Sequence, residues 1–261
     1  NCSKSEENAT NPKEENPSNP QNPQAPQQPP TPPQPQAPRQ TQEPPISSAD
    51  FTLSPDGKTL VRWNNTTRTT LDMKSHPLLS QVTTIGSSAF ENCYKLKTIV
   101  FSEALTSINT YAFSRSGLES VTIPETVTSI EDYAFYACNS LVSASIPKSA
   151  NTLGTLIFRN SIKLKEVTYG PTIVKSDLFI GCTSLEKVTL LEGVNTIDFQ
   201  AFRNLRNLTN LILKATTPPT LNSNAFYNTG LTHIYVPATS VDIYKSDREW
   251  RVFANKIQAI P

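Results

Sequence analysis

Apolar positions recur through the chain from Val82 onward at an interval of about 22 or 23 residues. Each copy of this pattern holds an aliphatic residue, a phenylalanine five residues later, and a leucine five or six residues after that. The seven phenylalanines are Phe90, Phe113, Phe135, Phe158, Phe179, Phe202 and Phe226. No single copy can bury its own apolar residues, so the pattern predicts that the copies stack and share one continuous core.

Each copy is interpreted as a strand, a short helical turn and a second strand, because two alternating apolar residues close it, as Val121 and Ile123 do in the second copy. Strands of neighbouring copies stack about 4.8 Å apart. The predicted fold is therefore an α/β repeat, a right-handed solenoid with a continuous parallel β-sheet along one face. The interval is typical of leucine-rich repeats, and seven of them are expected over residues 82–237.

The two open ends of such a stack need covers. The segment Phe51–Trp63 holds two alternating runs around a Pro-Asp-Gly turn, which predicts a β-hairpin, and TTLDM adds a third strand. An N-terminal hairpin cap is therefore expected over residues 46–81. A closing helix, forming a C-terminal helical cap over residues 238–261, is predicted from the near-helical spacing of Tyr244, Trp250, Phe253 and Ile257.

The first part of the chain has a different composition. Residues 12–45 hold 13 of the 22 prolines, with Gln and Asn between them. Proline cannot donate to a helix or sheet ladder, and little here could be buried to offset the entropy of ordering the segment. Residues 1–45 are predicted to be a disordered, extended Pro/Gln-rich tether; a tail without a role is the alternative.

The chain opens with NCSKSEEN, in which Cys2 precedes a polar, acidic lead. This arrangement resembles a bacterial lipoprotein after removal of its signal peptide, in which the cysteine carries the lipid. The resemblance implies an exported protein, lipid-anchored at Cys2 to the cell surface or outer membrane. An exposed cysteine without a lipid is the alternative.

The net charge of +1 comes from 23 basic and 22 acidic residues, and from residue 50 on the balance is 20 to 17. So small an excess predicts no binding to nucleic acid or to anionic membranes, which need clustered Lys and Arg on one face. No apolar run approaches the roughly 18 to 20 residues of a membrane-spanning helix. The expected link to a membrane is the lipid anchor alone.

Cys93, Cys138 and Cys182 each follow a repeat phenylalanine by three residues, where other copies carry Ser, Leu or Thr. A position that accepts these residues asks for modest volume, so three buried, reduced thiols are predicted. Disulfides are excluded because the cysteines lie two copies apart, about 9–10 Å, beyond the Cα separation of about 7 Å that a disulfide spans. No metal site, cofactor or catalytic residue is expected.

Residues that flank the inward position of each second strand point outward, because side chains alternate along a strand. In the first copies these residues are nearly all Ser and Thr, as an ordinary solvated strand also prefers. The later copies offer charges, an aliphatic residue and rings, and aromatic residues are enriched among interface anchors. The candidate binding residues are Glu166, Lys187, Asn210, Ile212, His233 and Tyr235. His233 alone is better interpreted as a strand-surface residue than as a metal ligand.

The repeats resemble the BspA-like leucine-rich repeat family in the segments VTTIGSSAFENCYKLKTIVF, VTSIEDYAFYACNSLVSASIP and SDLFIGCTSLEKVTL, and GLTHIYVPATSVDIYKS is similar to its closing segment. The copy at Asn151–Tyr169 departs from the pattern, with Leu156 and Ile157 where Tyr-Ala usually stands, and an irregular turn is expected there. The resemblance implies an exported bacterial surface protein that serves in adhesion or protein binding, and it carries no catalytic residues.

The resulting hypothesis is a non-enzymatic, adhesin-like interaction module at the cell surface, which binds a protein partner through the sheet face. The expected partner is a host or extracellular-matrix protein, and the chain is expected to be a monomer. A glycan-binding accessory surface protein is the first alternative, favoured less because Tyr235 is the one aromatic residue among the outward positions. A solenoid with a structural role and an enzyme are the further alternatives.

Overall fold

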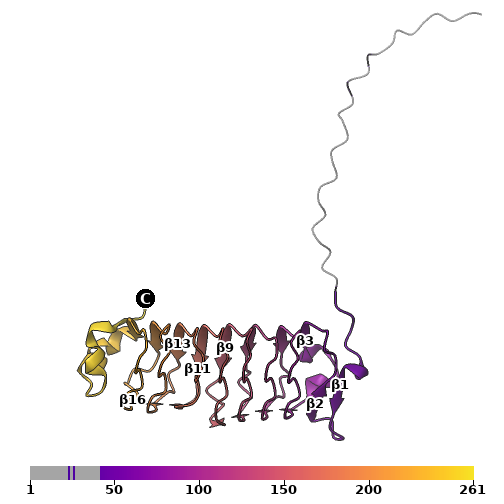
Figure 1. Ribbon diagram of the computed structural model, residues 1–261, viewed down its shortest axis with the longest axis horizontal. Helices are drawn as coiled ribbons and strands as arrows, with labels where there is room; N and C mark the ends of the chain where they lie inside the picture. The colour runs from indigo at the N-terminus through magenta and orange to yellow at the C-terminus, as the bar shows by residue number, and fades with distance from the viewer. Residues whose placement is uncertain (1–22, 24–25, 27–41) are drawn as a thin grey trace, which may run out of the picture. The chain divides into compact units, whose positions relative to one another are not determined.

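The computed structural model describes Pro23, Pro26 and residues 42–261. Cys2 and almost all of the predicted tether lie outside these residues. The chain divides into two units, Asn1–Gln42 and Glu43–Pro261, and every helix and strand described below belongs to the second. In this unit β9, β11 and β13 lie side by side along the long axis, one coil of the chain after another (Figure 1).

One side of the coils is a seven-stranded parallel sheet, called the large sheet below, in the order β18-β17-β15-β13-β11-β9-β7. Its strands are β7 (Ser120–Thr122), β9 (Ser143–Ile146), β11 (Glu166–Tyr169), β13 (Lys187–Leu190), β15 (Asn210–Leu213), β17 (His233–Val236) and β18 (Ile257–Ala259). The neighbours are in register, so that Val167 lies opposite both Ala144 and Val188. All three inward side chains are buried, as the alternating pattern predicts.

The sheet on this side is not continuous from end to end, which corrects the prediction. β5 (Thr98–Val100) pairs with β3 (Thr70–Asp72) in a separate two-stranded sheet. Between the first and second repeats a backbone hydrogen bond runs from Glu119 N to Lys97 O (3.0 Å), without strand pairing between β5 and β7. The interruption coincides with the shorter turn of the second repeat, in which Leu118 follows Phe113 by five residues rather than six.

The other strands of the coils form two sheets, with six strands in the order β1-β2-β4-β6-β8-β10 and three in the order β12-β14-β16. They are β1 (Phe51–Leu53), β2 (Thr59–Trp63), β4 (Thr84–Ile85), β6 (Ser107–Ile108), β8 (Ser129–Ile130), β10 (Thr152–Leu153), β12 (Ile173–Val174), β14 (Thr196–Ile197) and β16 (Thr220–Leu221). At the break, the Lys175 ammonium group donates to Leu153 O (2.9 Å) and Gly154 O (3.1 Å). A side chain here replaces part of the missing strand pairing.

The repeat phenylalanines form one stack through the interior. From Phe90 to Phe226, neighbouring rings lie 4.8 to 6.2 Å apart and within 17° of parallel. Every ring in the stack is buried. Trp63 continues the stack at one end (5.9 Å from Phe90). Trp250 covers the other end, with its ring 6.1 Å from Phe226 and tilted by 59°. The single shared core predicted from the sequence is confirmed.

The segment that carries each phenylalanine is a series of tight turns rather than a helical turn. Residues two before and two after the phenylalanine have left-handed φ, as Ser88 (57°) and Asn92 (61°) do in the first repeat. Left-handed residues interrupt a right-handed helix. The turns bond instead to the next repeat, through Ser88 N to Thr110 O (3.0 Å), Phe90 N to Ala112 O (2.7 Å) and Asn92 N to Ser114 O (2.9 Å). We call this row of bonds the turn ladder, and the side of the coils that carries it the turn edge.

The turn ladder is regular through the first four repeats and irregular afterwards. The copy expected to be irregular, Asn151–Tyr169, keeps left-handed Leu156 (57°) and Asn160 (61°). Its only ladder bond to the fifth repeat, among the described residues, is Asn160 N to Ile180 O (2.9 Å). In the fifth repeat Asp177 lacks the left-handed φ of its counterparts. The departure that the sequence placed in the fourth repeat is therefore centred on the fifth.

The N-terminal cap is the predicted hairpin. β1 pairs antiparallel with β2, and β2 then pairs parallel with β4, which joins the hairpin to the stack. The predicted third strand is β3, which pairs with β5. Three short 3₁₀ helices complete the cap: η1 (Ser48–Asp50), η2 (Met73–Ser75) and η3 (Leu79–Gln81).

The C-terminal cap is helical but is not the single helix that the spacing predicted. It consists of η4 (Ala238–Ser240), α1 (Val241–Ser246) and a second 3₁₀ segment, η5 (Trp250–Lys256), followed by β18. The helix ends at Asp247, which has extended backbone (ψ 143°) and accepts the N–H of Glu249 through its side chain (2.8 Å). Ile257, assigned to the helix from its spacing, lies on β18 and is buried there.

Side chains of this cap close the backbone of the last repeat. Trp250 Nε1 donates to Pro219 O (2.8 Å), and the Tyr244 hydroxyl donates to Ala215 O (2.8 Å). Glu249 Oε2 accepts a hydrogen bond from Leu221 N (3.1 Å). This N–H group would face a further repeat if there were one. These contacts supply the partners that the next coil would have offered.

Candidate functional site

The six predicted binding residues lie together on the outer face of the large sheet, in two rows. One row follows the register of β11, β13, β15 and β17 through Glu166, Lys187, Asn210 and His233. In the second row Ile212 lies opposite Tyr235. The structure thus brings all six onto four neighbouring strands.

Two contacts connect side chains within this set. Lys187 Nζ lies 3.4 Å from Glu166 Oε1, and the two side chains are 42% and 53% exposed. The His233 ring stacks almost parallel on Tyr235 with centroids 5.7 Å apart, and His233 Nδ1 lies 2.8 Å from Thr232 Oγ1. An ion pair this exposed stabilises the fold by less than about 1 kcal/mol. The charged pair is thus accessible to a partner at little cost to the fold.

Within residues 42–261, no three His, Cys, Asp or Glu side chains gather into a possible metal site. None of the helices there is both long and apolar enough to cross a membrane.

Cys93, Cys138 and Cys182 are buried and form no disulfide, as predicted. Burial raises the pKa of Cys93 to about 11, and raises the pKa of Cys138 and of Cys182 to about 12. Since the thiolate is the reactive form, these thiols are poor nucleophiles at neutral pH.

In some repeats the side chain at the cysteine position also makes a hydrogen bond, besides filling the modest volume inferred from the sequence. Cys138 Sγ donates to Phe113 O of the preceding repeat (3.1 Å), and Ser161 Oγ donates to Phe135 O in the same way (2.9 Å). Cys182 Sγ donates to Phe158 O likewise (3.2 Å). In the third to fifth repeats a small side chain with a donor therefore satisfies a buried carbonyl, whereas Leu205 in the sixth repeat has no donor.

Aromatic side chains that the sequence analysis did not assign gather on the turn edge. Tyr111 and Tyr133 stack with centroids 4.8 Å apart, and Tyr136 meets both rings edge-on. Further along, Phe199 is 49% exposed and Tyr227 is 56% exposed. The turn edge is therefore a second candidate surface, and it is richer in aromatic residues than the sheet face.

Two cavities open on the turn edge, and both lie where the turn ladder is incomplete. The larger, about 520 Å³, lies beside the turn of the seventh repeat. The other, about 410 Å³, lies between the turns of the fifth and sixth repeats. Both volumes fall within the range of about 300–1,000 Å³ that is typical of small-molecule sites.

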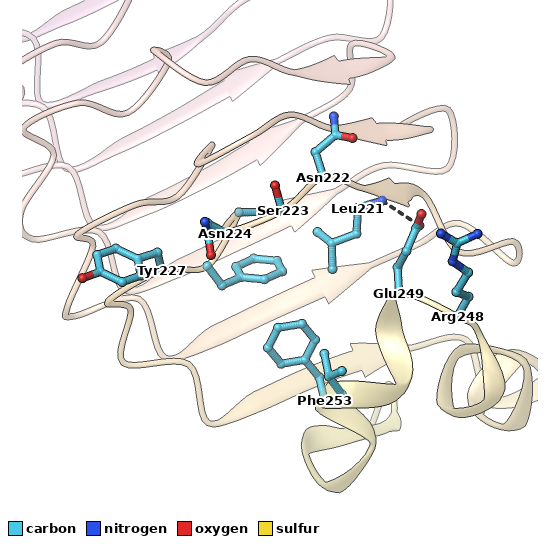
Figure 2. A pocket seen from close by; sticks show the side chains of 11 residues that line it. Leu221, Asn222, Ser223, Asn224, Tyr227, Arg248, Glu249 and Phe253 are labelled. Carbon is cyan, nitrogen blue, oxygen red and sulfur yellow. Dashed lines mark hydrogen bonds between the residues drawn. The ribbon is translucent and has the colours of Figure 1, made fainter.

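Figure 2 shows the larger cavity, with Asn222, Ser223 and Tyr227 of the last turn on one side and Arg248 and Phe253 of the C-terminal cap on the other. The dashed line in Figure 2 is the bond from Leu221 N to Glu249 Oε2. Among the described residues, the N–H groups of Asn224, Phe226 and Asn228 have no partner. The cap thus closes the ends of the sheets but leaves the end of the turn ladder open.

A change in spacing marks the irregular fifth repeat in the sequence. Leu164 and Val174 are ten residues apart, whereas the corresponding Leu141 and Leu153 are twelve apart. Gly170 lies in the shortened connection, where an added Cβ would stand 2.4 Å from Lys148 N. The spacing could have located the break, but not the cavity beside it.

Stacked copies of 21 to 24 residues, each adding one strand to an in-register parallel sheet, define the class of leucine-rich-repeat solenoids. The sequence model of a protein family, the BspA type leucine rich repeat region, matches residues 65–175 and 172–248 of this chain, in six copies. The chain belongs to this family.

Solved structures share the fold. A leucine rich repeat protein from T. pallidum is 22% identical, with a TM-score of 0.57 over 84% of this chain and 100% of that one. A leucine-rich repeat protein from Bacteroides ovatus (24% identity, TM-score 0.46, 74% of this chain) and a leucine rich cell surface protein from Faecalibacterium prausnitzii (20%, 0.37, 74%) are more distant in structure. The chain spans 58% and 64% of these two proteins, less than two thirds of either. No curated protein is similar enough to count as a relative.

Proposed function

We propose that the chain is a non-enzymatic, adhesin-like interaction module that binds a protein partner through the C-terminal half of the outer face of the large sheet. The observation that carries the proposal is the gathering of Glu166, Lys187 and Tyr235, with the three other candidates, on four paired strands. Membership of the BspA-type family supports it.

The chemistry of the two rows suits a flat protein surface. His233 and Tyr235 offer a stacked pair of rings, with Ile212 beside them. Glu166 and Lys187 add one charge of each sign. Interfaces commonly combine an apolar, aromatic centre with polar groups at the rim, and aromatic anchors contribute most of the binding energy.

The test compares the full chain with a Lys187→Glu, Tyr235→Ala double variant on an array of purified host-surface and extracellular-matrix proteins. Binding by the double variant is expected to be at least ten-fold weaker, since both the charge and the ring are lost. The matched control is a Ser120→Ala, Thr122→Ala variant on β7, which changes outward residues at the other end of the same face. Equal binding by the double variant, or an equal loss in the control, would refute the proposal.

We also propose that the protein is exported, held at the cell surface by a lipid on Cys2, and that it acts as a monomer. The proposed tether ends before Glu43 rather than at residue 45, because Glu43 is bonded to Thr69 and Thr70 of the folded unit. The opening NCSKSEEN and the family membership support this arrangement. Radioactive fatty acid should label the wild type in its native cell and not a Cys2→Ala variant. Labelling of both would contradict the anchor, and a dimer in sedimentation would contradict the monomer.

A further inference from the structure

The opening between the fifth and sixth repeats has hydrogen-bonding backbone groups on both of its walls. In the fifth repeat, the N–H groups that correspond to the ladder donors of the first repeat belong to Asp177, Phe179 and Gly181. In the sixth repeat, the carbonyl groups that correspond to the ladder acceptors belong to Phe199, Ala201 and Arg203. Among the described residues, none of these six groups has a partner. The cavity at the seventh repeat has a donor row with no such facing acceptor row.

The side chain of Asp177 is also without a partner within the described part of the chain. Its Oδ1 atom is shielded from solvent and accepts no hydrogen bond there. Two other carboxylates of the turn edge are bonded to a neighbouring repeat: Glu131 Oε2 accepts Thr110 N–H (2.9 Å), and Asp132 Oδ1 accepts Thr155 N–H (2.7 Å). A buried acceptor left unpaired costs about 1–3 kcal/mol, so Asp177 favours any ligand that donates to it.

The core beneath the opening limits what can enter. Phe179 and Phe202 stack with centroids 5.7 Å apart, which keeps the two turns at the ordinary separation of one repeat. An inserted peptide strand would need about twice the strand spacing of about 4.8 Å. The opening therefore accepts a small molecule from the outside, in a cavity of about 410 Å³.

The lining determines the charge and polarity of a matching ligand. Asp177 and the carbonyl row disfavour an anion, while Arg203 and the N–H row disfavour a cation. Gln200 and Asn204 each offer amide donors, while their carbonyl oxygens already accept from Arg203 (3.1 Å) and Asn228 (3.0 Å). The best match is a neutral molecule with many groups that both donate and accept, which is the property of hydroxyl groups.

An apolar surface lies beside these polar groups. Phe199 and Ile180, 49% and 47% exposed, both line the cavity. A sugar ring has hydroxyl groups at its edge and a C–H face that packs against an aromatic ring. A sugar ring therefore matches both the polar groups and the apolar surface of the cavity.

We propose that the opening in the turn ladder between the fifth and sixth repeats binds a neutral hexose unit of a glycan. Asp177 accepts from a sugar hydroxyl, the backbone groups of the two turns bond to the others, and Phe199 packs against the ring face. The site lies on the turn edge, away from the sheet face, so it does not depend on the protein-binding proposal.

Saturation-transfer difference NMR of the full chain with glucose, galactose, mannose and N-acetylglucosamine tests the site. At least one neutral sugar is expected to show transfer in the millimolar range. Asp177→Ala removes the acceptor, and Phe199→Ser replaces the ring by the residue found at the same position in other repeats, as in Ser87 and Ser223. Each variant is expected to weaken binding at least ten-fold. Thermal unfolding checks that each variant is folded.

Two control variants distinguish binding at this site from nonspecific binding. Tyr94→Ala removes an aromatic ring that is 66% exposed, on the turn edge of the first repeat, and is expected to leave sugar binding unchanged. Lys187→Glu on the sheet face is also expected to leave it unchanged. The proposal is overturned if no neutral sugar shows transfer, if Asp177→Ala and Phe199→Ser both bind as the wild type does, or if Tyr94→Ala loses binding equally.

Discussion

The large sheet and the turn edge belong to the same coils, but they respond differently to irregular repeats. From β7 to β18 the strands of the large sheet pair without a gap. On the turn edge the ladder has three bonds between the first and second repeats and none between the fifth and sixth. The fifth repeat is shortened in the connection that holds Gly170, and the large sheet on either side remains in register.

This difference separates two ways in which a repeat scaffold can recognise a ligand. On the large sheet the strands bond to one another, so a partner meets side chains such as Lys187 and Tyr235. At the opening in the turn edge the backbone groups of two turns have no partner within the described chain, and Asp177 lines the cavity beside them. A surface of side chains suits a broad partner, whereas a row of backbone groups in a cavity suits a small polar one.

The largest expected effect contrasts a core phenylalanine with one on the turn edge. Phe135→Ala removes a fully buried ring that stacks on Phe113 and Phe158, and it should lower the free energy of unfolding by about 3–5 kcal/mol. Phe199→Ala removes a ring that is half exposed, and should cost about 1 kcal/mol or less. Urea unfolding measures both. Equal losses would show that Phe199 is part of the core, and would also weaken its assignment to a ligand.

A smaller effect contrasts two tyrosine hydroxyls. Tyr244→Phe leaves the carbonyl of Ala215 without its partner in the C-terminal cap, at an expected cost of about 1–3 kcal/mol. The control is Tyr235→Phe on the sheet face, whose hydroxyl has no partner within residues 42–261 and whose loss should change stability by about 0.5 kcal/mol or less. If both variants unfold at the temperature of the wild type, the cap does not depend on the hydroxyl.

The periodic part of the molecule could be predicted from the sequence because each apolar position is repeated in every copy. The phenylalanine stack, the hairpin and the buried Cys138 and Cys182 are confirmed. The helical turn was wrong because residues such as Ser88 and Asn92 have left-handed φ values and donate their N–H groups to the next repeat. Apolar spacing does not record such bonds.

The candidate surfaces were predictable to different degrees for the same reason. Strand alternation and register follow from a two-residue period, so the rows of Glu166, Lys187 and Tyr235 could be derived. The cavity beside Asp177 arises from bonds that do not form, in a repeat whose apolar residues are all in place. Likewise, the helix ends at Asp247, whose side chain accepts a hydrogen bond from Glu249 N. Trp250 and Ile257 therefore lie on two separate elements, η5 and β18, although their spacing fits one helix.

The smallest expected effect concerns Glu43 at the edge of β3. The question is whether its carboxylate closes this strand edge, as Glu249 does at the C-terminal cap and as Asp177 does not. Glu43 accepts from Thr69 N (2.5 Å) and Thr69 Oγ1 (2.6 Å) with one oxygen, and from Thr70 N (3.1 Å) and Thr70 Oγ1 (2.8 Å) with the other. Burial acts to raise the pKa of Glu43, but these bonds outweigh it and lower the pKa from 4.5 to about 2. A carboxylate whose pKa is lowered stabilises the fold above about pH 4.5, and that stabilisation is lost as the pH falls toward 2.

Glu43→Gln should therefore lower the melting temperature by a few degrees at pH 6, and the difference from the wild type should shrink as the pH approaches 2. Comparing each variant with the wild type at the same pH cancels the protonation of other carboxyl groups. Glu186→Gln, an exposed site with no side-chain hydrogen bond or ion pair within the described chain, should show a small difference that does not change with pH. A gap between wild type and Glu43→Gln that stays constant from pH 6 to pH 2 would mean that the carboxylate does not hold the edge of β3.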